Sequence, residues 1–95
     1  FTQQAEKICA ERRRLYNALQ ELSGLRVYPS TANFLLFRVP EGTVGRVFDS
    51  LLQQNILIKN LDGQHDRLRD CLRVTVGTPD ENDLFLEALS VAISS

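Results

Sequence analysis

Residues 71–82 constrain the fold more than any other part of the chain, because they predict a strand, a sharp turn and the start of a helix. Strand alternation places Leu72, Val74 and Val76 on one face, which is apolar and should lie on a core. The opposite face carries Arg73 in its middle, where a charge is costly unless an anion meets it. The segment therefore puts Arg73 opposite a core and leaves open which group Arg73 holds.

The turn after this strand contains helix-start signals that agree with one another. Gly77 permits a tight turn, and Thr78, Pro79 and Glu81 suit the N-cap, the first helical position and the capping box. Their agreement predicts that the strand passes directly into a helix from Pro79 to about residue 93.

Hydrophobic periodicity divides the rest of the chain into two helices and three strands. We expect a helix at about 2–22, strands at 25–28 and 33–39, a helix capped by Thr43 and closed by residues 53–55, and a strand at 56–59. The strand at 33–39 is apolar on both sides, since Leu35 and Phe37 alternate with Phe34 and Leu36. Such a strand belongs in a sheet that is covered on both faces.

These elements predict a two-layer α+β domain with a small mixed, mostly antiparallel sheet and three helices on one face. Most loops are too short for parallel crossovers, which favours antiparallel pairing. Nothing in the chain remains to cover the second face, although Phe34 and Leu36 require cover. We therefore expect a second domain or subunit to pack there.

Composition narrows the classes of function. The 95 residues suffice for one domain, and the formal charge of -1 argues against binding to nucleic acid or to an anionic membrane. No apolar run approaches the roughly 20 residues of a membrane span. Cys9 and Cys71 fit no metal spacing and suggest reduced thiols in the cytoplasm. Phe1 leads directly into a helical pattern, so we expect the chain to be a piece of a longer protein.

Two basic residues are placed to bind a ligand, and motifs for catalysis or metal binding are missing. Arg73 lies mid-strand and Lys59 ends the preceding strand, so adjacent strands would bring both within reach of one anion. Alternatively, Arg73 pairs with Asp70 or Asp62, and Lys59 only discourages pairing at a sheet edge. His65, in the polar loop at 60–70, is expected to be a loop residue.

Three segments, residues 30–38, 55–59 and 71–82, together resemble the C-terminal part of the histidinol-phosphate aminotransferase family, a branch of the fold-type-I aminotransferases. This resemblance implies an enzyme that uses pyridoxal phosphate to move an amino group from glutamate onto imidazole acetol phosphate, as a homodimer. It implies that Arg73 helps to hold the phosphorylated substrate. Lys59 stands where many members have a second arginine, and Asn33 matches an asparagine that we interpret as structural, bonding the neighbouring backbone.

The family's cofactor-binding lysine belongs to a large domain, and neither Lys7 nor Lys59 matches its motif. The resemblance thus implies that this chain is the small C-terminal domain, that it binds no cofactor by itself and that it is inactive alone. Two alternatives stay open. One is a sister aminotransferase acting on aromatic or phosphorylated amino acids, and the other is a stand-alone α+β module that binds a small anion.

Overall fold

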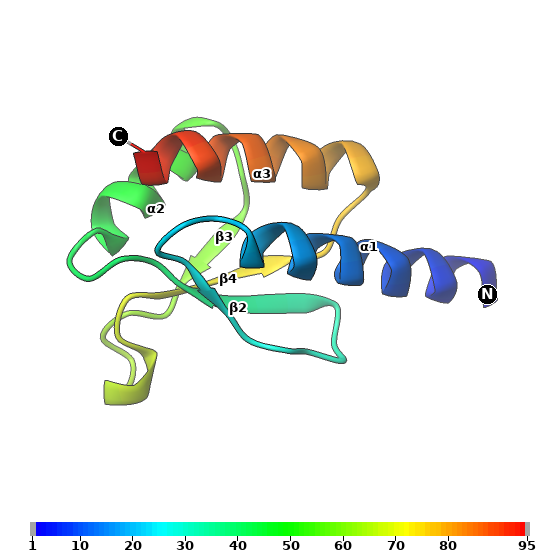
Figure 1. The fold of residues 1–95 in the computed structure, drawn as a ribbon, viewed down its shortest axis with the longest axis horizontal. Coiled ribbons are helices and arrows are strands. Elements are labelled where there is room, and N and C mark those ends of the chain that lie inside the picture. Colours follow the sequence, from blue (N-terminus) through cyan, green and yellow to red (C-terminus); the bar gives the residue numbers. More distant parts are fainter. Residues whose placement is uncertain (1, 95) are drawn as a thin grey trace.

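The computed structural model describes residues 2–94 and contains the predicted elements in the predicted order (Figure 1). The helices are α1 (Thr2–Gln20), α2 (Val44–Gln53) and α3 (Pro79–Ser94). The strands are β1 (Arg26–Val27), β2 (Phe34–Arg38), β3 (Ile58–Asn60) and β4 (Cys71–Thr75), and a short 3-10 helix, η1 (Asp66–Leu68), precedes β4.

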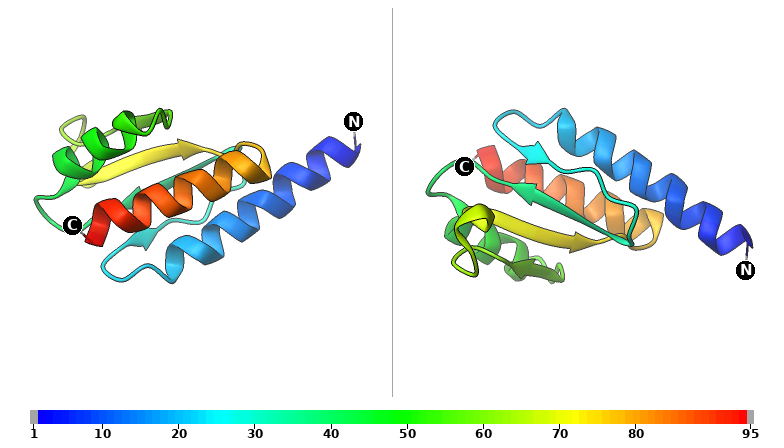
Figure 2. Two further views of the ribbon diagram at one scale, coloured as in Figure 1. Left: turned by 90° about the horizontal axis from the view of Figure 1, so that it is seen from above. Right: turned by 90° about the horizontal axis from the view of Figure 1, so that it is seen from below.

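The four strands form one sheet in the order β1-β2-β4-β3, and every pairing found between them is antiparallel. Strand β4 therefore lies between β2 and β3. All three helices lie over the same face of this sheet (Figures 1 and 2). The expectation of a two-layer α+β fold with three helices on one face is confirmed, and the sheet is antiparallel in all the pairings of residues 2–94.

The core lies between the sheet and the helices. Alternate residues of β2 and β4 face it, as strand periodicity predicts, and the rings of Phe37 and Phe85 meet edge to face with centroids 5.8 Å apart. The side chains that are fully shielded from solvent include Leu15, Leu19, Leu35, Phe37, Val47, Leu51, Leu72 and Leu89.

Two local expectations are wrong in detail. Thr43 precedes α2 but makes no side-chain cap, because its hydroxyl donates instead to the carbonyl of Pro40 at 2.6 Å. Strand β3 begins two residues later than expected, because the N–H of Ile56 bonds back to Leu51 at 3.1 Å and closes α2. At α3 the capping box is confirmed, since Thr78 and Glu81 exchange side-chain-to-backbone hydrogen bonds of 2.9 and 3.2 Å.

The second face of the sheet, called the open face below, carries none of the helices α1, α2 and α3 (Figures 1 and 2). Seen from below, the strands lie in front of the helices, and the segment before β4 is the part of the chain that lies over them (Figure 2). This segment, residues 61–70, is called the cover loop. The expectation that nothing in the chain covers the second face is therefore wrong at one end, where Cys71 is 0% exposed. Phe34 and Leu36, farther along β2, remain partly exposed.

Candidate functional site

The two predicted site residues are brought together on the open face. Lys59 of β3 and Arg73 of β4 are direct cross-strand partners in the antiparallel ladder. Side chains in such a position stand about 4.5–5.5 Å apart at Cβ, and like charges there repel each other. A pair of cations in this arrangement is stabilised by an anion that both can reach. The geometry therefore supports an anion site between these two strands.

Arg73 has no acidic partner among residues 2–94, where both ion pairs involve Arg14 instead. Its guanidinium lies over the ring of Phe34, 5.0 Å from the centroid. Stacking of this kind holds the guanidinium plane while leaving its edge donors free for an oxyanion. Arg73 is thus oriented by an aromatic ring on the neighbouring strand.

The alternative in which Arg73 pairs with a nearby aspartate is contradicted. Asp62 accepts the backbone N–H of Asp70 at 2.8 Å, and Asp70 accepts the N–H of Gly42 at 3.3 Å. Both carboxylates therefore serve loop backbone rather than Arg73. Lys59 is exposed at the sheet edge, so a role in limiting edge pairing is compatible with a role in binding.

The turn that follows β4 is fixed by Asn82, which is 2% exposed. Its side-chain amide donates to the carbonyl of Gly77 at 3.0 Å and accepts the N–H of Gly77 at 2.9 Å. The same amide donates to Glu11 of α1 at 2.9 Å. Arg14 bonds to Glu11 at 2.7 Å, and these contacts, chiefly that of Arg14, lower the pKa of the Glu11 carboxyl. The strand that carries Arg73 is therefore tied to two helices.

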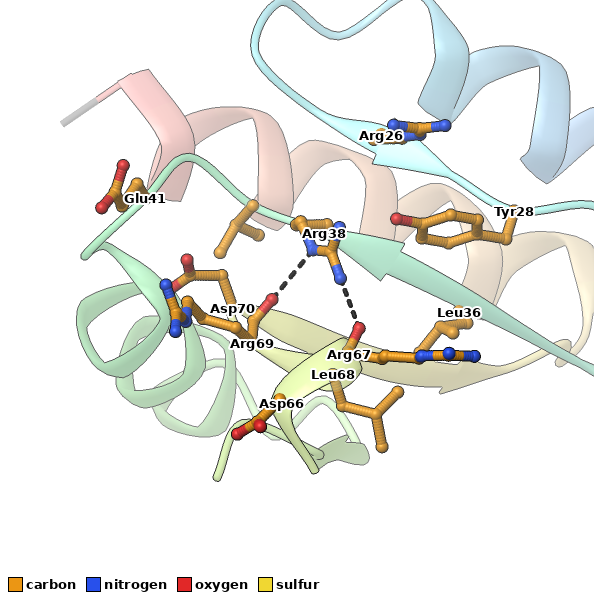
Figure 3. Close-up of a pocket in the computed structure, with 11 residues that line it drawn as sticks. Arg26, Tyr28, Leu36, Arg38, Glu41, Asp66, Arg67, Leu68, Arg69 and Asp70 are labelled. Carbon is orange, nitrogen blue, oxygen red and sulfur yellow. Dashed lines mark hydrogen bonds between the residues drawn. The ribbon is translucent and has the colours of Figure 1, made fainter. Parts of the chain in front are cut away.

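A hollow of about 800 Å³ opens on the same face, between β2 and the cover loop (Figure 3). Its walls come from Arg26, Tyr28, Leu36 and Arg38 of the strand region and from residues 66–70 of the cover loop. Leu36 is the cross-strand partner of Arg73 on the other side of β4. The hollow thus adjoins the Arg73 site, and the cover loop forms its far wall.

The lysines of the described residues are exposed, which bears on where a cofactor could bind. A lysine that forms a Schiff base is activated by a desolvated or cationic environment within a pocket, whereas Lys7 and Lys59 are both exposed. Lys59 does have the cation Arg73 opposite, but it stands at the open sheet edge. Within residues 2–94 there is also no group of three or more metal-ligating side chains, and no helix there is long and apolar enough to cross a membrane.

Sequence reasoning missed two arginines that organise the surroundings of the site. Arg12 of α1 donates to the carbonyls of Thr31 and Ala32 at 3.1 Å each. Arg38 donates to backbone carbonyls of the cover loop. Asn33 accepts the N–H of Val76 at 2.8 Å through its main-chain carbonyl, whereas its side chain, which was expected to bond the neighbouring backbone, makes no hydrogen bond within the described residues. Carbonyl acceptors leave no pattern in a sequence, so these contacts had no signal there.

Comparison with known proteins gives a consistent result. Residues 1–89 match the family model described as aminotransferase class I and II. The chain is 54% identical over 87 residues to "Histidinol-phosphate aminotransferase 2" of Nitrosococcus oceani, covering 92% of this chain and 24% of that protein. The chain thus spans about a quarter of the length of the curated relatives it matches.

Solved structures resemble this fold closely. The histidinol-phosphate aminotransferase of Clostridium acetobutylicum superposes with a TM-score of 0.81 at 29% identity, over 92% of this chain and 26% of that one. The L-threonine-O-3-phosphate decarboxylase of Porphyromonas gingivalis superposes with a TM-score of 0.85 at 27% identity, over 95% and 28% of the two chains.

Proposed function

We propose a function from the premise that the chain belongs to the aminotransferase class I and II family. In this proposal the chain is the small C-terminal domain of a histidinol-phosphate aminotransferase. The whole enzyme would convert histidinol phosphate and 2-oxoglutarate into imidazole acetol phosphate and glutamate, in histidine biosynthesis. The observation that carries the proposal is the 54% identity, over 92% of this chain, to a relative that bears this name.

The site geometry supports a phosphorylated substrate. A phosphate offers several oxygens, so an arginine can grip two of them while a lysine adds a point charge. Arg73 and Lys59 face each other across one ladder and suit these two roles. In our proposal they bind the anionic end of the substrate and orient the rest of it away from the sheet.

The cofactor would be pyridoxal phosphate, which supplies the amino-transfer chemistry of this family. Since the lysines of this chain are exposed, we propose that a larger domain of the same protein holds the cofactor and faces the open side of the sheet. This arrangement would cover Phe34 and Leu36. We further propose that the whole enzyme is a cytoplasmic homodimer and that this chain alone is inactive.

The full-length protein, loaded with pyridoxal phosphate, tests the proposal. Glutamate formation from 2-oxoglutarate is measured with histidinol phosphate, phenylalanine and tyrosine as competing amino donors. We expect the highest kcat/KM with histidinol phosphate. A preference for an aromatic donor would leave the family assignment intact and would assign a different substrate. Absence of turnover with every donor, with anion binding retained by the chain alone, would favour the small-anion module instead.

A second candidate has one observation in its favour, which is the TM-score of 0.85 to a threonine-phosphate decarboxylase. That enzyme shares the phosphorylated character of the substrate, so an Arg73–Lys59 anion site would suit either reaction. The two are separated by supplying L-threonine O-3-phosphate and measuring carbon dioxide release. Release without glutamate formation would select the decarboxylase. The lower identity, 27% against 54%, makes us favour the aminotransferase.

A further inference from the structure

Arg38, at the end of β2, reaches across the open face and fastens the cover loop (Figure 3). Its Nε donates to the carbonyl of Arg69 at 2.9 Å, and its Nη2 donates to the carbonyl of Arg67. The thiol of Cys71 also points at the carbonyl of Arg69, at 3.5 Å. One side chain thus holds the loop at two places, directly above a cysteine that is shielded from solvent.

The cover loop joins the two strands that carry the proposed anion site. Lys59 lies in β3, just before the loop, and Arg73 lies in β4, three residues after it. Strand β3 has three residues and, within residues 2–94, pairs only with β4. An edge strand this short depends on its turn for its position. The placement of Lys59 opposite Arg73 therefore depends on the loop.

Before Asp70, the loop is otherwise held mainly by its own backbone and by short side chains. Asp62 accepts the N–H of Asp70, and Leu61 donates to the carbonyl of Cys71 at 3.0 Å. Asp70 adopts a left-handed backbone conformation with φ of 61°, which is unfavourable for a residue other than glycine. Asp70 is held from outside the loop, because its main-chain carbonyl accepts the N–H of Val39 at 2.9 Å and its carboxylate accepts the N–H of Gly42 at 3.3 Å. Arg38 extends this hold to the residues before Asp70, because its bonds reach the carbonyls of Arg67 and Arg69.

We propose that Arg38 is a positioning residue, which holds the cover loop on the open face and thereby sets Lys59 and Arg73 at the spacing that binds the substrate phosphate. This inference rests on the proposed function. It assigns Arg38 no contact with substrate. Its effect passes through the loop to the β3–β4 hairpin.

Arg26 provides a matched control. It is the cross-strand partner of Arg38, it lines the same hollow, and its guanidinium lies 5.5 Å from the Tyr28 ring centroid, against 5.8 Å for Arg38. Arg26 makes no hydrogen bond to the cover loop within the described residues. Replacing either arginine by glutamine removes the same charge and the same stacking. Only the Arg38 variant loses the hold on the loop.

The test compares full-length wild type, Arg38→Gln and Arg26→Gln in two assays. In the first, we expect Arg38→Gln to raise the KM for histidinol phosphate by roughly 3- to 10-fold, as loss of one or two hydrogen bonds would, with kcat within about twofold of wild type. In the second, iodoacetamide labelling of Cys71 in the native protein, followed by peptide mass mapping, should be several-fold faster. Arg26→Gln should match wild type in both assays.

Arg38→Lys adds a graded variant, because a lysine can donate to one loop carbonyl but cannot span both. We expect it to give intermediate values, and it replaces Arg38→Gln in both assays if that variant does not fold. An active wild type with Arg38→Gln indistinguishable from Arg26→Gln would overturn the inference alone. Faster labelling with an unchanged KM would also overturn it, because the loop would then be held without affecting the site. A wild type without turnover of any phosphorylated donor would refute the proposed function, and the positioning role with it.

Discussion

The two faces of the sheet are built from the same strands and differ in how far the chain completes them. On the helix face, Leu35, Phe37 and Leu72 are fully buried among residues of all three helices. On the open face, Phe34 and Arg73 are partly exposed and Lys59 is exposed. The helix face is thus packed against other described residues, whereas the open face has few packing contacts outside the cover loop.

This difference separates stability from binding. Residues of the helix face exclude water and are the main source of folding free energy. Residues of the open face include two cations in register, which contribute nothing to a core and repel each other. We infer that the helix face specifies the fold and that the open face is reserved for a ligand and for the rest of the protein. Substitutions on the two faces should then affect different measurements.

The largest effect is expected from Phe37→Ala on the helix face. The Phe37 ring is fully buried and meets Phe85 edge to face, so its removal should destabilise the domain by about 3–5 kcal/mol. Phe34→Ala, on the same strand but the open face, should cost roughly 1 kcal/mol, since its ring is only partly buried. Urea unfolding of the full-length variants gives both values. Equal costs would mean that the contrast between the faces disappears in the whole protein.

The next effect concerns binding rather than folding. Under the proposed function, Arg73→Ala in the full-length protein should lower kcat/KM for histidinol phosphate by an amount equivalent to about 2–4 kcal/mol, because the proposed charged contact to the substrate is lost. The unfolding midpoint should stay close to that of wild type. Arg73→Lys keeps the charge but cannot bind two phosphate oxygens at once, so its kcat/KM should lie between those of wild type and Arg73→Ala. Unchanged kinetics in Arg73→Ala would contradict the assigned role.

Asn82 connects the two faces, because it fixes the turn that ends the Arg73 strand. Asn82→Ala leaves both backbone groups of Gly77 without their side-chain partner in a shielded site, and we expect a loss of about 1–3 kcal/mol in unfolding free energy. Asn82→Asp keeps the acceptor for Gly77 but sets a carboxylate against Glu11. It should therefore also be destabilised, more at neutral than at acidic pH. An Asn82→Ala variant as stable as wild type would show that the turn needs no side-chain support.

Sequence reasoning predicted the features that depend on periodicity and on local signals. The alternation of Leu72, Arg73 and Val74 gave the correct faces of β4, and Thr78 with Glu81 correctly marked the start of α3. The pairing of Lys59 with Arg73 could be expected because a strand, a polar loop and a second strand follow one another in the chain. Each of these inferences needs only residues that are close in sequence.

The features that could not be predicted depend on long-range contacts to backbone atoms. The cover loop has a polar composition that indicates exposure to solvent, yet it lies over Cys71, and both Arg38 and the Cys71 thiol donate to the carbonyl of Arg69. Likewise, Arg12, one of three consecutive arginines in α1, holds the segment before β2 by donating to two of its carbonyls. The acceptors in both cases are backbone carbonyls, which every residue has, so these contacts can be recognised only in the folded structure.

The smallest effect is a pH dependence that belongs to the helix side alone. Glu11 accepts bonds from Arg14 and from Asn82, so its pKa in the folded protein lies below the ordinary value of 4.5. A lowered pKa contributes stability that is present above pH 4.5 and is lost as the pH falls through the folded pKa. Because Arg14 is exposed, the contribution should stay below about 1 kcal/mol.

Comparison of Glu11→Gln with Glu6→Gln isolates this contribution. Both substitutions remove one negative charge from α1, but within the described residues Glu6 takes part in no ion pair, whereas Glu11 pairs with Arg14. Urea unfolding between pH 3 and 7 should show a shallower loss of stability below about pH 4.5 in Glu11→Gln than in wild type. Glu6→Gln should follow wild type throughout. If both variants follow wild type, the Glu11–Arg14 pair helps to position the turn after the Arg73 strand but adds no measurable free energy of unfolding. Because the pair lies on the helix side, kcat/KM for histidinol phosphate should not change in either variant at neutral pH.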